Sequence, residues 1–171
     1  MSNVKAGPVD QLVEIRLPLM RRLTLAVSIV ATCGLGIAAQ PKPAAPSPST
    51  VVVYKSPTCG CCGAWITHLQ AHGFQVEANN LPDAQLRAVG KAAGVTDDLA
   101  SCHTAKVGGY IVEGHVPAED IRRLLKEKPA IVGITAPGMP MGSPGMEGGA
   151  KQPYNVIAFT KDGKRTVFAK H

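Results

Sequence analysis

The sequence predicts an α/β domain with a central mixed sheet, flanking helices and a C-terminal β-hairpin. Three observations lead to this fold class. A β-branched run, Val51-Val52-Val53, leads into a helical pattern that begins near Cys61. Strand and helix patterns then alternate along the chain, as is typical of the α/β class. Asp162-Gly163 joins two short strand patterns near the C-terminus, which is a strong hairpin signal.

Each element is predicted from its own local signals. The expected strands cover residues 50–55, 74–78, 107–112, 155–160 and 165–169. The expected helices cover residues 61–72, 82–93 and 117–128, and each places its apolar residues on one stripe. Gly73 and Gly94 suit the ends of the first two helices, and Pro129 stops the third. Gly108 and Gly109 fall inside the third expected strand, where they would allow another backbone to approach closely.

Three cysteines lie within four residues, Cys59-Gly60-Cys61-Cys62, at the first strand–helix junction. The Cys-x-x-Cys spacing of Cys59 and Cys62 in a β-α-β pattern predicts a thioredoxin-like layer. Backbone N–H groups at the helix start would favour the thiolate, the form that binds soft metals and attacks disulfides. Thioredoxin-like folds usually place a cis-proline just before the third strand, where residues 104–107 read Thr-Ala-Lys-Val. That departure weakens a simple oxidoreductase interpretation.

Residues 1–49 are expected to precede the folded domain. Met20-Arg21-Arg22, an apolar segment over residues 23–31 and small residues up to Ala39 form the pattern of a secretory signal peptide cleaved after Ala39. We expect translation to start at Met20. A membrane anchor is the alternative, but the apolar stretch is short for a bilayer span, so no stable span is expected after cleavage. A loose lipoprotein box at residues 30–33 leaves lipid anchoring open. Residues 1–39 are thus the N-terminal extension and signal peptide, 40–49 a proline-rich linker and 50–171 the domain.

The composition argues against a nucleic-acid-binding protein. The chain has a formal net charge of +6, but aromatic residues make up only 4% of it. The basic residues are dispersed, and no basic helix interleaves with stacking side chains. We therefore expect the positive net charge to contribute to ordinary solubility and not to indicate a nucleic-acid partner.

Of the five cysteines, Cys33 would leave with the signal peptide, so four remain in the domain. Two structural disulfides are one interpretation for an oxidising compartment. The spacing argues against it, because bridges within one tight turn close very small loops and stabilise little. Cys102-His103 would lie at the same end of a thioredoxin-like sheet as the first three cysteines. The alternative for this pair is an inert buried cysteine beside a surface histidine.

A segment rich in Pro and Gly carries three further candidate ligands, Met139, Met141 and Met146. Methionines usually fill gaps in a core, but here the surrounding residues cannot form a core helix or strand. Thioethers favour Cu(I) over zinc and are not lost to disulfide formation. Cysteines combined with a Met-rich loop therefore favour copper over structural zinc.

Three other histidines are weaker candidates. His68 and His72 are four residues apart on the first helix, so they could form a metal pair or simply occupy a solvated face. His115 follows the third strand and is a weak candidate ligand.

Four motifs together resemble the CopG-type copper-resistance family, long catalogued as a domain of unknown function. They are Lys55-Ser56-Pro57-Thr58-Cys59-Gly60-Cys61-Cys62, Cys102-His103-Thr104, Glu113-Gly114-His115-Val116-Pro117 and the segment from Gly138 to Met146. The resemblance covers residues 50–170 and implies a thioredoxin-like fold, copper binding and a periplasmic location in Gram-negative bacteria. It carries over Cys59, Cys61, Cys62 and Cys102 as thiolate ligands, Met139 and Met141 as supporting ligands, and Met146 and His103 as further candidates.

The leading hypothesis is an exported copper-binding protein that sequesters Cu(I) or handles the Cu(I)/Cu(II) redox state in copper resistance. Its partners would be copper ions and other periplasmic copper-handling proteins. A second hypothesis is a thiol–disulfide oxidoreductase in which Cys59 is the nucleophile and Cys62 the resolving thiol. A third is a structural zinc domain. Whether the protein turns over as a copper or thiol oxidoreductase is left open by the sequence.

Overall fold

The computed structural model describes residues 50–171, so the predictions for the signal peptide and the linker lie outside the described residues. The strands are β1 (Thr50–Lys55), β2 (Gln75–Asn80), β3 (His103–Val107), β4 (Tyr110–Gly114), β5 (Gly133–Ala136), β6 (Asn155–Phe159) and β7 (Arg165–Lys170). The helices are α1 (Gly60–Ala71), α2 (Asp83–Ala92) and α3 (Ala118–Glu127). No helix in this part of the chain is long and apolar enough to cross a bilayer.

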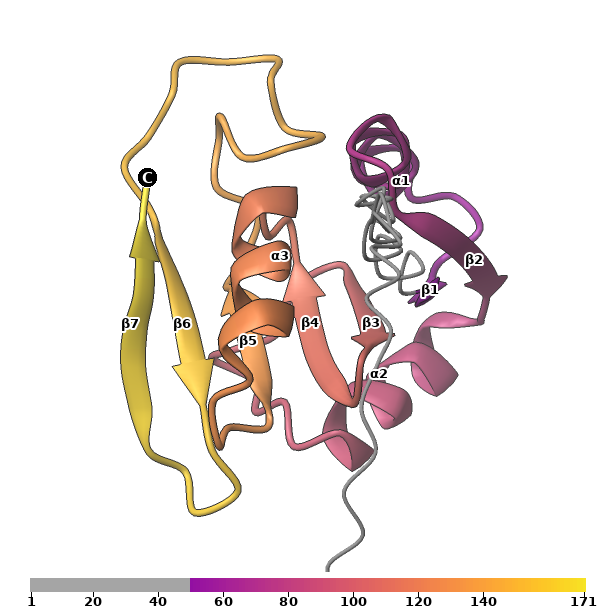
Figure 1. The fold of residues 1–171 in the computed structure, drawn as a ribbon. Helices are drawn as coiled ribbons and strands as arrows, with labels where there is room; N and C mark the ends of the chain where they lie inside the picture. Colours follow the sequence, from indigo (N-terminus) through magenta and orange to yellow (C-terminus); the bar gives the residue numbers. More distant parts are fainter. Residues whose placement is uncertain (1–49) are drawn as a thin grey trace, which may run out of the picture. The chain divides into compact units, whose positions relative to one another are not determined.

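The strands form one mixed sheet of seven strands in the order β2-β1-β3-β4-β5-β6-β7 (Figure 1). β1 pairs parallel with β2 and antiparallel with β3, and β3 pairs antiparallel with β4. β5 joins β4 in parallel, and the antiparallel pair β6–β7 completes the sheet. The predicted α/β class with a mixed sheet, flanking helices and a C-terminal hairpin is therefore confirmed.

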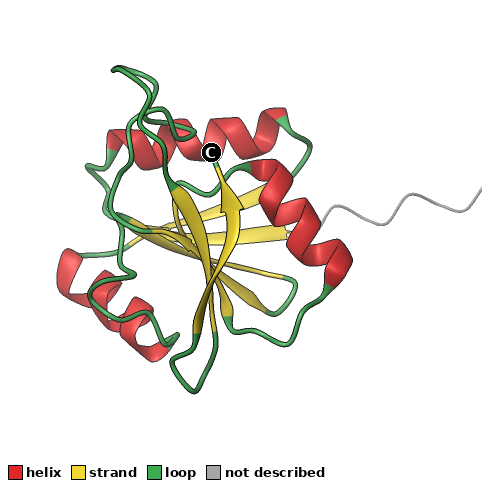
Figure 2. Cartoon of the chain, turned by 90° about the vertical axis from the view of Figure 1, so that its left-hand side faces the viewer, coloured by secondary structure: helices red, strands yellow, loops and turns green. Residues whose placement is uncertain are grey.

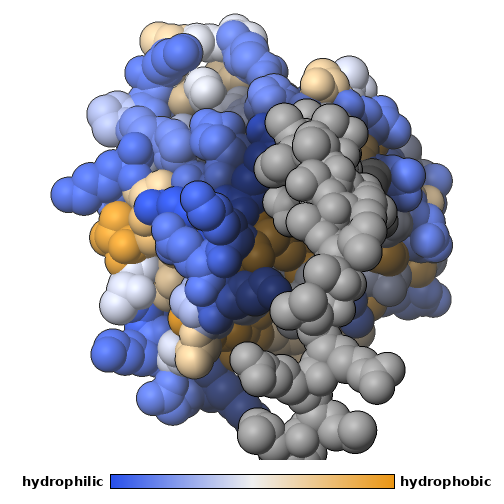
Figure 3. Space-filling model, in the orientation of Figure 1, coloured by the Kyte–Doolittle hydropathy of each residue, from blue (hydrophilic) through white to orange (hydrophobic). Residues whose placement is uncertain are grey.

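The helices cover both faces of the sheet (Figure 2). α1 and α3 pack on one face through a buried apolar cluster that includes Trp65, Leu69, Ile121 and Leu124. α2 lies on the opposite face, which holds a smaller cluster that includes Val95 and Leu99. Hydrophilic side chains cover most of the described surface on the face seen in Figure 3. The turn that carries Cys59 connects β1 of this sheet to α1, and helices cover both faces of the sheet.

The third predicted strand is wrong, because residues 107–112 contain a chain reversal. Gly108 and Gly109 have φ angles of +55° and +86°, and they form the turn between β3 and β4. Positive φ at both central positions is what a tight hairpin turn requires, and glycine adopts it without steric cost. The hairpin places Thr104 opposite Glu113, so Cys102 and His115 flank the same end of the pair.

Candidate metal centre

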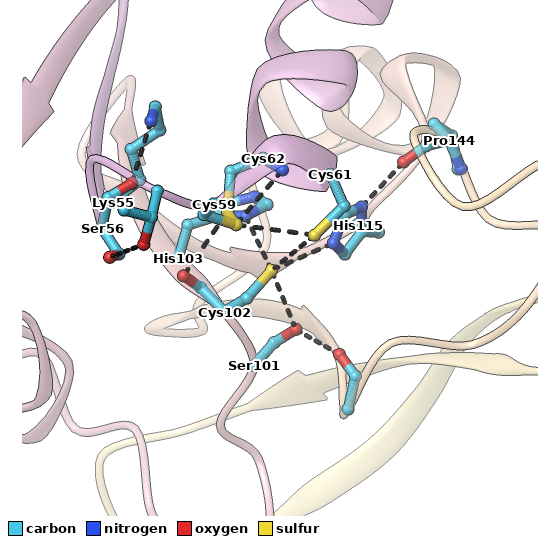
Figure 4. The surroundings of a disulfide bond; sticks show 12 residues. Lys55, Ser56, Cys59, Cys61, Cys62, Ser101, Cys102, His103, His115 and Pro144 are labelled. Atoms are coloured by element: carbon cyan, nitrogen blue, oxygen red, sulfur yellow. Dashed lines mark hydrogen bonds between the residues drawn. A yellow bond between two sulfur atoms is a disulfide. The ribbon is translucent and has the colours of Figure 1, made fainter. Parts of the chain in front are cut away.

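The cysteine turn is built on the start of α1. Cys59 is the N-cap residue of the helix, and its Sγ accepts a hydrogen bond from the Cys62 backbone N–H at 3.3 Å. A disulfide joins Cys59 to Cys62, with their Cα atoms 5.4 Å apart (Figure 4). Cys61 and Cys102 are free thiols. One cysteine pair is therefore oxidised in this structure, and the other two cysteines are available as thiols.

Cys102 brings a fourth sulfur to this turn from a distant part of the sequence. It directly precedes β3, at the carboxyl end of the neighbouring β1. Its Sγ lies 3.9 Å from that of Cys61, and Cys61 Sγ lies 3.5 Å from that of Cys59. The sulfur atoms of Cys59, Cys61, Cys62 and Cys102 all lie within 4.8 Å of one another. The structure thus brings together all four cysteines that the sequence singled out in the domain.

Two buried histidines extend the cluster beyond the sulfurs. His115 Nε2 is 3.0 Å from Cys102 Sγ, and His103 Nδ1 is 3.4 Å from the same atom (Figure 4). The ligand atoms of Cys102, His103 and His115 form a second group within 4.8 Å. His103 was a predicted candidate, whereas His115 was only a weak one. The one sequence signal for His115 was its place in the Glu113-Gly114-His115 segment, directly after a strand.

The orientation of the His115 ring is set by the Met-rich loop. His115 Nδ1 lies 2.8 Å from the backbone carbonyl oxygen of Pro144. Because a carbonyl can only accept, Nδ1 carries the hydrogen, and Nε2 presents its lone pair toward Cys102. A hydrogen bond of this kind on the far nitrogen is how metal-binding histidines are commonly held.

Burial disfavours the charged forms of Cys102, His103 and His115. Burial and the neighbouring Cys61 raise the pKa of the Cys102 thiol to about 12. Burial and the neighbouring His115 lower the pKa of His103 to about 3, and burial also lowers the pKa of His115. His103 Nε2 has no hydrogen-bond partner although the side chain is buried. The site therefore offers neutral imidazoles and a protonated thiol, and a bound cation would displace the thiol proton.

Glu113, which lies on β4, holds the residues on either side of Cys102 in place. Its carboxyl accepts hydrogen bonds from Ser101 N at 2.8 Å and from Thr104 Oγ1 at 2.7 Å, on either side of Cys102. The side chain is only 3% exposed, and burial raises its pKa to about 7. Ser101 Oγ also donates to the Gly138 carbonyl, which ties this segment to the start of the Met-rich loop.

The Met-rich loop packs against α1 at one tight point. A Cβ at Gly145 would lie 2.7 Å from Cys61 O and 2.8 Å from Trp65 N, so only glycine fits this approach. Met139 is 52% exposed, and the end of Met141 faces Gly149 of the same loop. Met146 is half-buried beside Gly145. The loop thus borders the site, and the ligand roles of the three thioethers stay predictions.

His68 has a packing role, and His72 lies exposed beside it. His68 Nε2 accepts a hydrogen bond from Ala118 N, at the start of α3, at 3.2 Å. The two imidazole rings lie against each other at a tilt of 42°, with centroids 4.2 Å apart, and His72 Nδ1 contacts the His68 carbonyl at 2.7 Å. Neither belongs to a metal-ligating cluster within residues 50–171. His68 therefore helps to join α1 to α3.

Comparison with known proteins places the chain in a family. A family model described as a protein of unknown function, DUF411, matches residues 99–146. Two solved structures of copper resistance protein CopG, described as Form 1 and Form 2, each superpose with a TM-score of 0.67 at 43% sequence identity. Each match covers 72% of this chain and 98% of the solved chain. No curated protein matches the sequence. At this identity and coverage, the chain belongs to the CopG family of copper resistance proteins.

Proposed function

We propose that this protein is an exported copper-binding protein that binds Cu(I) through Cys59, Cys61, Cys62 and Cys102 and acts in copper resistance or copper redox handling. The observation that carries the proposal is the convergence of these four sulfur atoms within 4.8 Å. The solved relatives are copper resistance proteins, which supports copper as the cargo.

The donor chemistry of the site fits copper. Thiolates are soft ligands that select Cu(I), and neutral imidazole suits copper as well as zinc. Four thiolates alone would also satisfy a tetrahedral zinc site. The additional imidazoles of His103 and His115 exceed what one structural zinc ion needs, and they support a site for more than a single tetrahedral ion. Met139, Met141 and Met146 would supply supporting thioethers from the loop that borders the site.

Copper binding by all four cysteines requires the disulfide to open. A disulfide sulfur carries no thiolate charge and is a poor metal ligand. Reduction of the Cys59–Cys62 bond by two electrons and two protons would yield two further thiols beside Cys61 and Cys102. The oxidation state of the Cys59–Cys62 pair would therefore determine how many thiolates the protein can offer to copper.

The disulfide also supports a second candidate, a thiol–disulfide oxidoreductase in which Cys59 is the nucleophile and Cys62 the resolving thiol. The element order β1-α1-β2-α2-β3-β4-α3, with the sheet order β2-β1-β3-β4 and the cysteines at the β1–α1 junction, supports a thioredoxin-like layer. In this candidate, metal-free protein would reduce insulin disulfides, Cys59→Ser would abolish the reaction, and loss of Met139 and Met141 would leave it unchanged.

A periplasmic location would suit both candidates. The signal-peptide pattern before residue 40 supports export, and a disulfide persists in an oxidising compartment. Copper ions and other copper-handling proteins of that compartment would be the partners. Fractionation of cells that express the full chain tests this location, and retention in the cytoplasm would contradict it.

Anaerobic titration of the reduced protein with Cu(I), in the presence of a competing Cu(I) chelator, tests the leading proposal. We expect the Cys59/Cys61/Cys62 triple serine variant to lose most of its affinity. Zinc titrated under the same conditions should be displaced by Cu(I). The Thr58→Ser variant is a matched control, because it changes an exposed side chain in the same turn and supplies no sulfur. Copper binding by the triple variant as tight as that of the parent would overturn the proposal.

A further inference from the structure

A cavity of about 450 Å³ lies directly beside the disulfide. It is lined by the turn before α1, including Ser56, Thr58 and Cys59, and by residues of α2. The segment from Ser101 to Thr104 and Glu113 also line it. This volume suits a small molecule, and none of the metal-site chemistry described above uses its α2 wall.

The two sulfurs of the disulfide differ in their access to this cavity. Cys59 is half-buried and lines the cavity, whereas Cys62 is fully buried at 0% exposure and does not line it. Of the two disulfide cysteines, only Cys59 can therefore be reached by a nucleophile in the cavity. In addition, the Cys62 N–H donates to Cys59 Sγ, which would stabilise the Cys59 thiolate after reduction.

The residues that line the cavity include positively charged, negatively charged and apolar side chains. Arg87 and Lys91 lie one turn apart on α2, and Lys91 forms an exposed ion pair with Asp97 at 3.9 Å. Arg87 forms no ion pair within the described residues. Asp83 supplies a carboxylate, and Leu86 supplies apolar surface, at the same wall. A small molecule with a carboxylate, an ammonium group and a short apolar part would find complementary groups here.

We propose that this cavity binds a small zwitterionic thiol, cysteine or a short cysteinyl peptide, that opens the Cys59–Cys62 disulfide. This inference rests on the proposed function, because it names the reductant that would prepare the site for copper. The carboxylate of the ligand pairs with Arg87, and its thiol faces Cys59.

The reaction balances in two exchange steps. The ligand thiolate attacks Cys59 Sγ, forms a mixed disulfide with it and breaks the Cys59–Cys62 bond, so Cys62 leaves as a thiolate and takes up a proton. A second ligand thiolate attacks the ligand sulfur of the mixed disulfide and releases Cys59 as a thiolate. Two ligand thiols are oxidised to one disulfide, and the protein gains two thiols.

The test uses metal-free, disulfide-bonded protein under anaerobic conditions. Opening is followed by fluorescence of the single tryptophan, Trp65, which is buried in the same helix as Cys62. With reduced glutathione as the probe, we expect the opening rate to saturate as the concentration rises. With 2-mercaptoethanol, an uncharged thiol, we expect a linear dependence. A linear dependence for glutathione as well would overturn the proposal.

A matched pair of variants tests the charge contact. Arg87→Gln should raise the half-saturating glutathione concentration about threefold, as expected for the loss of one solvent-exposed ion pair. Lys126→Gln removes the charge of an exposed side chain on α3, which does not line the cavity, and should leave that concentration unchanged. Equal effects of the two variants would contradict a specific site at α2.

The attacked atom is tested separately with Cys62→Ser, which cannot re-form the disulfide. Oxidised glutathione should add one tripeptide to this variant, and peptide mapping should find it on Cys59. An adduct mainly on Cys61 or Cys102 would overturn the assignment of Cys59. If protein reduced by dithiothreitol binds Cu(I) while glutathione shows no saturation, the cavity proposal fails and the copper proposal stands. If the opening rate saturates with glutathione but the reduced protein does not bind Cu(I), the copper proposal fails and the glutathione-binding cavity stands.

Discussion

The contact between the Met-rich loop and α1 can be tested with one methyl group. Gly145 has a φ of +87°, and a Cβ there would lie 2.7 Å from Cys61 O, 2.8 Å from Trp65 N and 3.3 Å from His115 Nδ1. Gly145→Ala therefore requires the loop to move away from the start of α1. Because Pro144 is the preceding residue, this movement would also stretch its 2.8 Å hydrogen bond with His115 Nδ1.

Two effects add up in the expected cost of Gly145→Ala. An L-residue in the left-handed region costs about 1–2 kcal/mol, and overpacking of a tight contact adds about 1–3 kcal/mol. The free energy of unfolding should therefore fall by about 2–5 kcal/mol. Gly138 isolates the second effect, because it has a φ of +69° but a Cβ there meets no atom within 4 Å. Gly138→Ala should thus lower the free energy of unfolding by only about 1–2 kcal/mol.

Urea unfolding followed by Trp65 fluorescence measures both variants. We expect the two to unfold with similar m-values and at different midpoints. Cu(I) affinity of reduced protein should fall about 10–100-fold in Gly145→Ala, the usual effect of losing a hydrogen bond that orients a metal-binding histidine. Equal costs for Gly145→Ala and Gly138→Ala, together with parental copper affinity in both, would refute the packing described here.

Three further changes probe the neighbouring contacts. His115→Gln should weaken Cu(I) affinity about tenfold or more in the chelator competition, because it removes the imidazole next to Cys102. Glu113→Ala should lower the free energy of unfolding by about 2–4 kcal/mol, because two donors that flank Cys102 lose their acceptor, whereas Glu113→Gln keeps an acceptor oxygen and should cost less. Burial and then His72 lower the pKa of His68 below 6.5, so its contribution to stability is full above pH 6.5 and is lost as the pH falls through the folded-state pKa. His68→Gln should therefore show a smaller loss of stability than the parent between pH 8 and pH 5 in urea titrations, and an unchanged pH dependence would contradict this.

Local sequence signals predicted most elements and failed at two. The hairpin turn at Gly108-Gly109 was missed because β-branched residues on both sides made one continuous strand pattern. A Gly-Gly pair between apolar runs is itself a hairpin signal, so the information was present. β5 was missed for a different reason. It is only four residues long and fully buried, so it shows no alternation between apolar and polar positions.

The candidate site could be predicted as far as its cysteines. Cys59, Cys61 and Cys62 are adjacent in sequence, and Cys102 was expected at the same sheet end. His115 could not be placed, because its position depends on the β3–β4 register and its ring orientation depends on a carbonyl 29 residues away. Every residue has a backbone carbonyl, so a sequence motif does not reveal which carbonyl contacts His115. The tertiary structure was therefore needed to identify this part of the site.

Opening the disulfide should change the ligand set without unfolding the domain. The bond joins residues three apart in sequence, and loops this short contribute little to stability by restricting the unfolded chain. α1 also remains anchored independently of the bond, because Trp65 Nε1 donates to Val116 O at 2.9 Å and Leu69 is fully buried. A reductant can therefore raise the number of thiols beside His103 and His115 from two to four while the sheet and helices keep them in place. If the protein binds copper as proposed, the rigid fold would set the positions of the ligands, and the oxidation state of the Cys59–Cys62 pair would decide how many thiolates are available.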